Sequence, residues 1–231
     1  MRARTTIISL LTLGSLMLGS FAIADDANAQ HDRVREACPG VVAWERNRIH
    51  DHLPTVDPST ITAPTLRGEI MKMAEDDQAV RNISPKVLAS EGSAALEEVN
   101  KVDAGNLAKL RQIVKDHGIP TPHMIGDKGM EAFWMLVQHA DHDPLLQQKV
   151  LTALFSDSRG LPLNEIALLI DRVQINRGEP QTYGTQFHRE GGKFAPDPIR
   201  DSSELAARRK SMGLMPIVDY ECVLRATYNE R

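Results

Sequence analysis

The sequence predicts a mainly α protein, a single irregular multi-helix domain with one small β-hairpin. Three observations lead to this prediction. Apolar residues recur with the helical period from residue 66 onward. Prolines and glycines stand where these periodic segments stop. Between residues 179 and 200 no helical period is found, and two short extended segments flank Gly191-Gly192, which predicts a hairpin over about 182–195.

The first 24 residues have the pattern of a signal peptide. Arg2 and Arg4 precede an uncharged, mostly apolar run that ends in Ala22-Ile23-Ala24, and Ala27-Asn28-Ala29 offers a second cleavage signal. We expect cleavage after residue 24 or 29 and a secreted or periplasmic protein that leaves the membrane. The alternative is an uncleaved anchor, because the charge-free stretch is just long enough to span a bilayer.

The composition limits the classes of partner that the protein is expected to bind. About 200 residues remain after cleavage, which suits one domain. The formal charge of -4 becomes -6 without Arg2 and Arg4, and no cluster of basic and aromatic residues remains, so no nucleic-acid partner is expected. Cys38 and Cys222 would form a disulfide in an oxidising compartment, or stay two unrelated thiols; both readings are open. The oligomeric state is unknown.

The elements follow from local signals. We expect a weakly ordered N-terminal arm over residues 25–65, with a short helix near 41–49. Residues 66–231 are expected to form the helical domain. A first helix covers 66–81, before Pro85. A second follows Asp103 as its N-cap and ends at Gly118.

The next helix, from Met130, is apolar nearly all round and is the expected buried centre. Asp143-Pro144 starts another helix, to about residue 155. A further helix is predicted over about 163–177, and Gly178 ends it. Asp201 with Glu204 resembles a capping box, and Pro216 starts the last helix.

Carboxylates occupy core positions of two of these helices. In the stripe that includes Ile70 and Met73, the next core position is Asp77, and the stripe of the central helix reaches Asp141. A buried charge needs a partner or a purpose. Arg81 is spaced i,i+4 from Asp77, so the two are expected to form an ion pair.

Several short motifs resemble those of an uncharacterised bacterial domain family of unknown function. They are Asp77-Gln78-x-x-Arg81, Gln138-His139-Ala140-Asp141, Asp171-Arg172-Val173 and Pro180-Gln181-x-Tyr183-Gly184-Thr185-Gln186. Several motifs in one order are more specific than any one of them. The resemblance covers about residues 66–220 and implies no known activity, substrate or cofactor.

The motif residues suit acid–base chemistry in one internal polar pocket. His139, Asp171 and Asp77 are the candidate catalytic groups. The candidate ligand-binding residues are Gln78, Arg81, Gln138, Asp141, Arg172, Gln181, Tyr183, Thr185 and Gln186. No metal and no cofactor is expected, because the spacing of His139 and Asp143 is a weak signal and Asp143 is better explained as an N-cap.

Three functions remain open at this stage. No Ser or Cys nucleophile motif, phosphate loop or dinucleotide loop is present, which disfavours covalent catalysis. The first is an exported protein that binds a small polar, peptide or glycan ligand and, as an enzyme, hydrolyses it. A non-catalytic interaction module is the second. In the third, the polar residues form a structural network that fixes helix packing.

Overall fold

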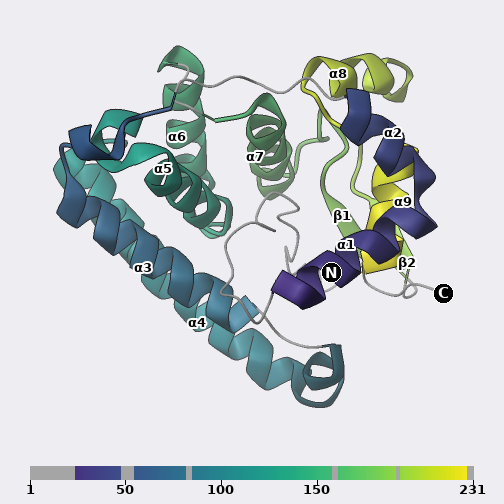
Figure 1. The fold of residues 1–231 in the computed structure, drawn as a ribbon, viewed down its shortest axis with the longest axis horizontal. Coiled ribbons are helices and arrows are strands. Elements are labelled where there is room, and N and C mark those ends of the chain that lie inside the picture. Colours follow the sequence, from purple (N-terminus) through teal and green to yellow (C-terminus); the bar gives the residue numbers. More distant parts are fainter. Residues whose placement is uncertain (1–23, 48–54, 82–84, 158–160, 191–192, 228–231) are drawn as a thin grey trace. The chain divides into compact units, whose positions relative to one another are not determined.

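The computed structural model describes residues 24–47, 55–81, 85–157, 161–190 and 193–227 (Figure 1). It confirms the mainly α prediction, since two short strands are the only extended elements of the described residues. The predicted signal segment lies almost wholly outside the described residues. Within them, no helix combines the length and the apolar character that crossing a membrane requires.

The elements in chain order are α1 Ala24–Ala37, α2 Pro39–Asn47, the 3₁₀ turn η1 Pro58–Thr60, α3 Pro64–Arg81, α4 Pro85–His117, α5 Pro122–Gln138, α6 Pro144–Asp157, α7 Leu163–Asn176, β1 Phe187–Glu190, β2 Lys193–Pro196, the 3₁₀ turn η2 Ser202–Glu204, α8 Leu205–Ser211 and α9 Ile217–Thr227. They fall into two compact units. The helical unit is residues 52–162; the mixed unit joins residues 1–51 to 163–231.

In the helical unit, α3 packs against α4 and α5, and α5 also packs against α6 (Figure 1). The predicted buried helix is the centre of this unit, because the side chains of 132–137 are all buried. It begins earlier than predicted and contains a break at Gly126, whose φ of 68° is left-handed. This φ favours glycine, and a Cβ at residue 126 would lie 2.8 Å from Ile61 Cδ1, so the Ile61 side chain would have to move.

The start of α4 differs from the prediction. The helix begins at Pro85 rather than after Asp103, so Asp103 lies in mid-helix and caps nothing. The segment 85–102 is rich in Ala, Glu and Lys, which favour helix, but its apolar period is weak. Helix propensity, rather than the apolar period, therefore explains why this segment is helical.

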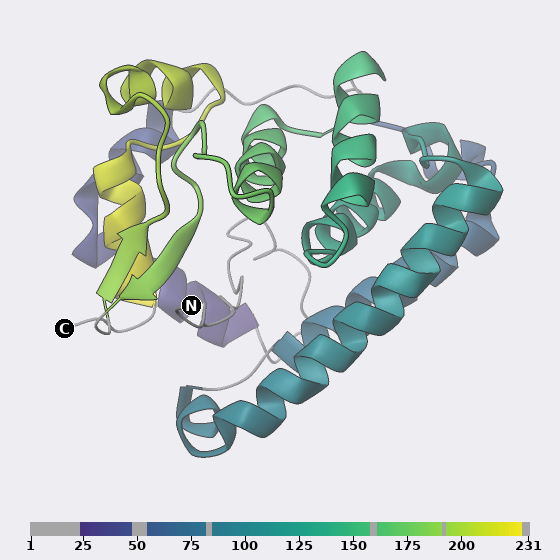
Figure 2. The same ribbon diagram turned by 180° about the vertical axis from the view of Figure 1, so that it is seen from behind.

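In the mixed unit, the N-terminal helices pack on α9 (Figure 2). Val34, Cys38 and Val41 form a small core with Val223. Residues 24–47 thus form two helices where the sequence predicted a weakly ordered arm with one short helix. The difference arises because the partner of these apolar residues lies at the opposite end of the sequence.

A disulfide joins Cys38 to Cys222, with 5.9 Å between their Cα atoms. It connects residues 184 positions apart, so it removes much conformational freedom from the unfolded chain. We expect reduction to lower the free energy of unfolding by about 2–4 kcal/mol. Urea unfolding with and without dithiothreitol measures this difference. The double variant Cys38→Ser, Cys222→Ser should be as unstable as the reduced protein and indifferent to dithiothreitol; equal midpoints for oxidised and reduced wild type would contradict the prediction.

The predicted hairpin is present as β1 and β2, with Phe187 opposite Pro196. Residues 182–186, expected in its first strand, are instead an irregular loop. The predicted capping box at Asp201 is wrong. Asp201 has a left-handed φ of 39° and makes no side-chain cap bond, and the turn η2 stands between it and α8. The hairpin leads into a core of Phe187, Tyr220 and Leu224.

Candidate functional site

Asp77 occupies a fully buried position on α3, as its place in the apolar stripe predicted. Ile70 and Met73, on the same stripe, are also buried. The helix therefore points a carboxylate into the interior of the helical unit. Such a group requires hydrogen bonds and positive charge around it.

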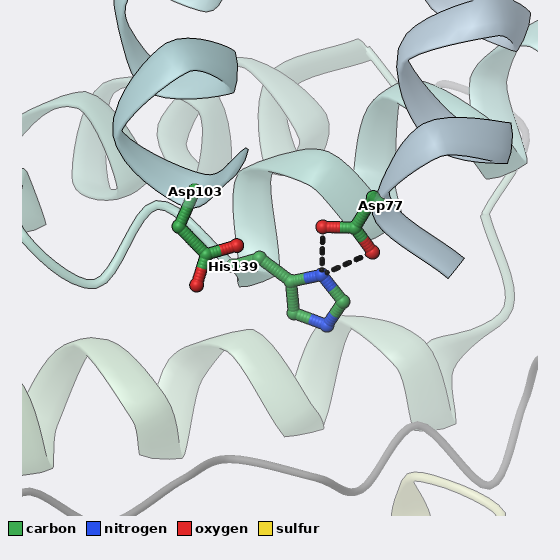
Figure 3. A group of neighbouring side chains, drawn as sticks. All are labelled: Asp77, Asp103 and His139. Carbon is green, nitrogen blue, oxygen red and sulfur yellow. Dashed lines mark hydrogen bonds and ion pairs between the residues drawn. The ribbon is translucent and has the colours of Figure 1, made fainter. Parts of the chain in front are cut away.

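His139 supplies one of these partners. It is the C-cap of α5, with φ -84° and ψ -2°, because the helix ends at Gln138. Its Nδ1 lies 2.9 and 3.0 Å from the two carboxylate oxygens of Asp77 (Figure 3). The other ring nitrogen, Nε2, points away from Asp77.

Arg81 binds the same carboxylate from one turn along α3. Its Nε donates to Asp77 Oδ2 at 3.1 Å and its Nη2 donates to Oδ1 at 3.3 Å. The Nη2 group also donates to Asp103 of α4. Gln78 Nε2 completes the set with a 3.0 Å bond to Asp77 Oδ2. Asp77, Arg81, Asp103 and His139 are named the His139 cluster below.

The charges of the His139 cluster set the pKa values of its acids. Burial acts to raise the pKa of Asp77, but the hydrogen bonds and positive charge of His139 and Arg81 outweigh it and hold the pKa below its ordinary value. Burial raises the pKa of Asp103, against the opposing charge of Arg81. Asp77 is therefore the carboxylate that stays ionised most firmly.

Three members of the cluster could also hold a metal ion. Asp77, Asp103 and His139 each offer one ligand atom, and these atoms lie within 4.8 Å of one another (Figure 3). An ion there would compete with Arg81, which already donates to both carboxylates. The cluster thus contains its own cation. Asp143, the other ligand considered from the sequence, instead caps α6 through Leu146 N at 3.0 Å and pairs with Arg111.

The remaining residues of the second motif lie at the end of α5. Gln138 is buried, with 1% of its surface exposed. Asp141 Oδ1 accepts a 3.4 Å hydrogen bond from Gln147 Nε2, which also donates to the carbonyl of Val137. His139 contacts Asp77, whereas Asp141 contacts Gln147.

The mixed unit holds a second polar group around residues 181–186, the motif loop. Asp171 of α7 is fully buried and accepts four hydrogen bonds from this loop. Its Oδ1 accepts from the backbone N–H of Thr182 and Tyr183, and its Oδ2 accepts from the N–H and hydroxyl of Thr185, all at 2.8–2.9 Å. Burial raises the pKa of Asp171, although these donors oppose the rise.

Two arginines of α8 hold the carbonyl side of the motif loop. Arg209, with 2% of its surface exposed, donates to the carbonyls of Tyr183 and Gly184 at 2.7 and 2.9 Å. It also lies 5.3 Å from the centre of the Tyr220 ring. Arg208 Nε donates to the carbonyl of Thr182 at 2.8 Å. The loop is therefore fixed from both sides by buried charge.

Most of the polar side chains predicted to bind ligand from this loop serve the loop itself. Gln181 is fully buried and bonds both the N–H and the carbonyl of Gln186. Thr185 bonds Asp171, and Gln186 Nε2 donates to Thr185 Oγ1. Arg172 lies buried on α7. Tyr183 is half-buried, and its backbone rather than its phenol makes these contacts.

A family model matches residues 64–231 and describes a family of unknown function. The chain belongs to this family, DUF6624. No curated protein and no solved structure matches it. Both polar groups lie within the DUF6624 region, whereas Cys38 and the helices α1 and α2 lie before it. The family description names no activity, so function has to be argued from the geometry.

The candidate residues of this DUF6624 chain thus fall into two groups. Asp77, Gln78, Arg81 and His139 meet in the helical unit, and Asp171 meets the motif loop in the mixed unit. The prediction of one shared pocket stays a prediction.

Sequence reasoning missed Asp103 as a site residue. Asp103 stands four residues before Leu107 and seven before Leu110, both buried, so it lies on the apolar face of α4. That spacing, the same signal that revealed Asp77, could have found it had the helix been extended toward its true start. Arg209 is a buried charge that the candidate residues did not include.

Proposed function

We propose that this exported DUF6624 protein binds a small polar, peptide or glycan ligand and hydrolyses it by metal-free acid–base chemistry, with His139 as the acid–base group. One observation carries the proposal: Asp77 accepts a hydrogen bond from His139 Nδ1 at 2.9 Å while Nε2 points away from it (Figure 3). A carboxylate in this position orients an imidazole and stabilises the imidazolium that forms when it takes a proton.

The rest of the His139 cluster supports this role. Arg81 and Gln78 hold the carboxylate of Asp77 from other directions, so its rotation is restricted. Asp103 in turn binds Arg81. An ionised, firmly held Asp77 favours the tautomer with the proton on Nδ1, which leaves the Nε2 lone pair to accept a proton from water or a ligand.

This tautomer is a testable prediction. In the folded wild type near pH 8, the neutral His139 ring is expected to be protonated on Nδ1. Long-range ¹H–¹⁵N correlation spectra distinguish the two ring nitrogens. His142, exposed three residues along the chain, serves as the reference and should show the mixture of a solvated ring. A His139 ring protonated on Nε2 would overturn the proposed base.

Activity is the decisive test. The mature protein would be assayed against chromogenic esters, phosphate esters and glycosides and against N-acylated peptides. We expect turnover of at least one class, and a loss of about 10²–10⁴-fold in kcat for His139→Gln. His142→Gln, the matched control, should keep full activity. Turnover that His139→Gln retains, or no turnover in any class, contradicts the proposal.

The non-catalytic module keeps one supporting observation, the burial of the His139 side chain, which is only 4% exposed. If ligand binds without turnover, and binding is lost in His139→Gln, the protein is a binding module. If His139→Gln only lowers the melting temperature, the cluster is structural. Each outcome is separate from the one that the hydrolase predicts.

A further inference from the structure

The motif loop has a shape that is set by its own hydrogen bonds. Its amides and carbonyls are paired with buried side chains and neighbouring backbone. The partners are Asp171, the Gln181 side chain, the carbonyl of Pro198, the amide of Arg200, Arg208, Arg209 and the Tyr220 hydroxyl. Side chains that extend from so restrained a backbone lose little further freedom when they bind a ligand.

Arg208 brings a positive charge to this loop that no carboxylate of the described residues contacts. Its Nε donates to the carbonyl of Thr182, and its Nη2 donates to the carbonyls of Arg200 and Asp201. The Nη1 group has no acceptor among the residues that the structure describes. Arg209 differs, because the charge of Asp171 acts on it across the loop.

Tyr183 stands beside this charge. Its N–H donates to Asp171 at 2.9 Å and its carbonyl accepts from Arg209 at 2.7 Å, so its Cα is held from both sides. Its hydroxyl makes no hydrogen bond within the described part of the chain. Burial, and then the charge of Asp171, raise the pKa of Tyr183 despite the opposing charge of Arg208. The phenol therefore remains a hydrogen-bond donor at neutral pH.

We propose that Arg208 and Tyr183 form a recognition site for a small oxyanion, a carboxylate or phosphate group of a ligand. The anion accepts hydrogen bonds from Arg208 Nη1 and from the Tyr183 hydroxyl, and it balances the charge of Arg208. Guanidinium and phenol donors are both suited to oxyanions. The site lies in the mixed unit and does not rest on the proposed chemistry of His139, so either proposal can fail alone.

The test uses the mature, oxidised protein labelled with ¹⁵N. Sodium acetate and sodium phosphate are titrated separately at constant ionic strength, and glucose is the uncharged comparison. We expect saturable shifts of the amides of residues 182–185 with acetate, phosphate or both, and none with glucose. Arg208→Gln and Tyr183→Phe should each weaken binding about tenfold, the effect of losing a charge-assisted hydrogen bond.

Lys210→Gln is the matched control, because Lys210 is an exposed cation on the same helix, α8. It should bind the anions as wild type does. Arg208→Lys, which keeps the charge, serves if Arg208→Gln fails to fold, and is expected to bind more weakly than wild type. Saturation by acetate alone identifies a carboxylate site, and saturation by phosphate alone identifies a phosphate site. Absent or non-saturating shifts, or equal losses in Arg208→Gln and Lys210→Gln, overturn the proposal.

Discussion

The Asp77→Ala protein is expected to be less stable than wild type by about 3–5 kcal/mol, the cost of breaking a buried ion pair. The side chain of Arg81 is 10% exposed and that of His139 is 4% exposed, so water can replace the hydrogen bonds and charge of Asp77 only poorly. Without Asp77, Arg81 keeps one carboxylate, Asp103, and His139 loses its acceptor. Urea unfolding at pH 7, followed by far-UV circular dichroism, gives the free-energy difference.

Asp76 is the natural control, because it precedes Asp77 on α3 but has a side chain that is 52% exposed. Its ion pair with Lys72 is a surface pair of the kind that contributes little to stability. Asp76→Ala should therefore leave the unfolding midpoint nearly unchanged. Equal shifts for the two variants would mean that the His139 cluster does not stabilise the fold.

The same carboxylate predicts a dependence on pH. Its pKa is below the ordinary value of 3.8 in the folded protein, so the unfolded chain takes up the proton first. The stabilisation is present above about pH 4 and is lost as the pH falls through the folded pKa. The stability difference between wild type and Asp77→Asn should shrink over this acidic range, and a difference that is constant from pH 7 to pH 3 would contradict the assignment.

Local signals predicted much of the fold. Gly118 and Gly178 end α4 and α7, and both have left-handed φ angles, 72° and 76°. Asp143 caps α6 with the hydrogen bond that its place before Pro144 indicated. These features depend on a few adjacent residues, so a single sequence contains the information. The start of α4 was not predicted in this way, because helix propensity extends the helix through 85–102, where the apolar period is weak. The left-handed conformation of Asp201 was not predicted either, because the spacing of Asp201 and Glu204 indicated a capping box.

The candidate site shows the same division. Asp77 could be predicted as a buried carboxylate because it occupies a position in the apolar stripe of α3. Arg81 could be predicted as its partner from the i,i+4 spacing. His139 and Asp103 reach Asp77 and Arg81 from other helices, so only the tertiary structure shows that they meet. Likewise, nothing in the pattern of the motif loop indicates that the side chain of Gln181 binds the backbone of Gln186.

Removing the carboxylate of Asp171 should cost about 2–6 kcal/mol, since the N–H groups of Tyr183 and Thr185 would lose their acceptor at about 1–3 kcal/mol each, whereas the N–H of Thr182 keeps Gln174 Oε1 at 3.0 Å. Asp171→Ala also removes one of the negative charges that act on the buried Arg209. Thr185→Val removes the hydroxyl that donates to Asp171 and accepts from Gln186 Nε2, so it should cost about 1 kcal/mol. Asp32→Ala, at an exposed site of α1 in the same unit, is the control and should resemble wild type.

Chemical denaturation ranks the three variants, and amide hydrogen exchange locates the change. Faster exchange at residues 182, 183 and 185 is expected, because their N–H groups bind Asp171. Unchanged exchange there would show that the loop holds its shape without Asp171.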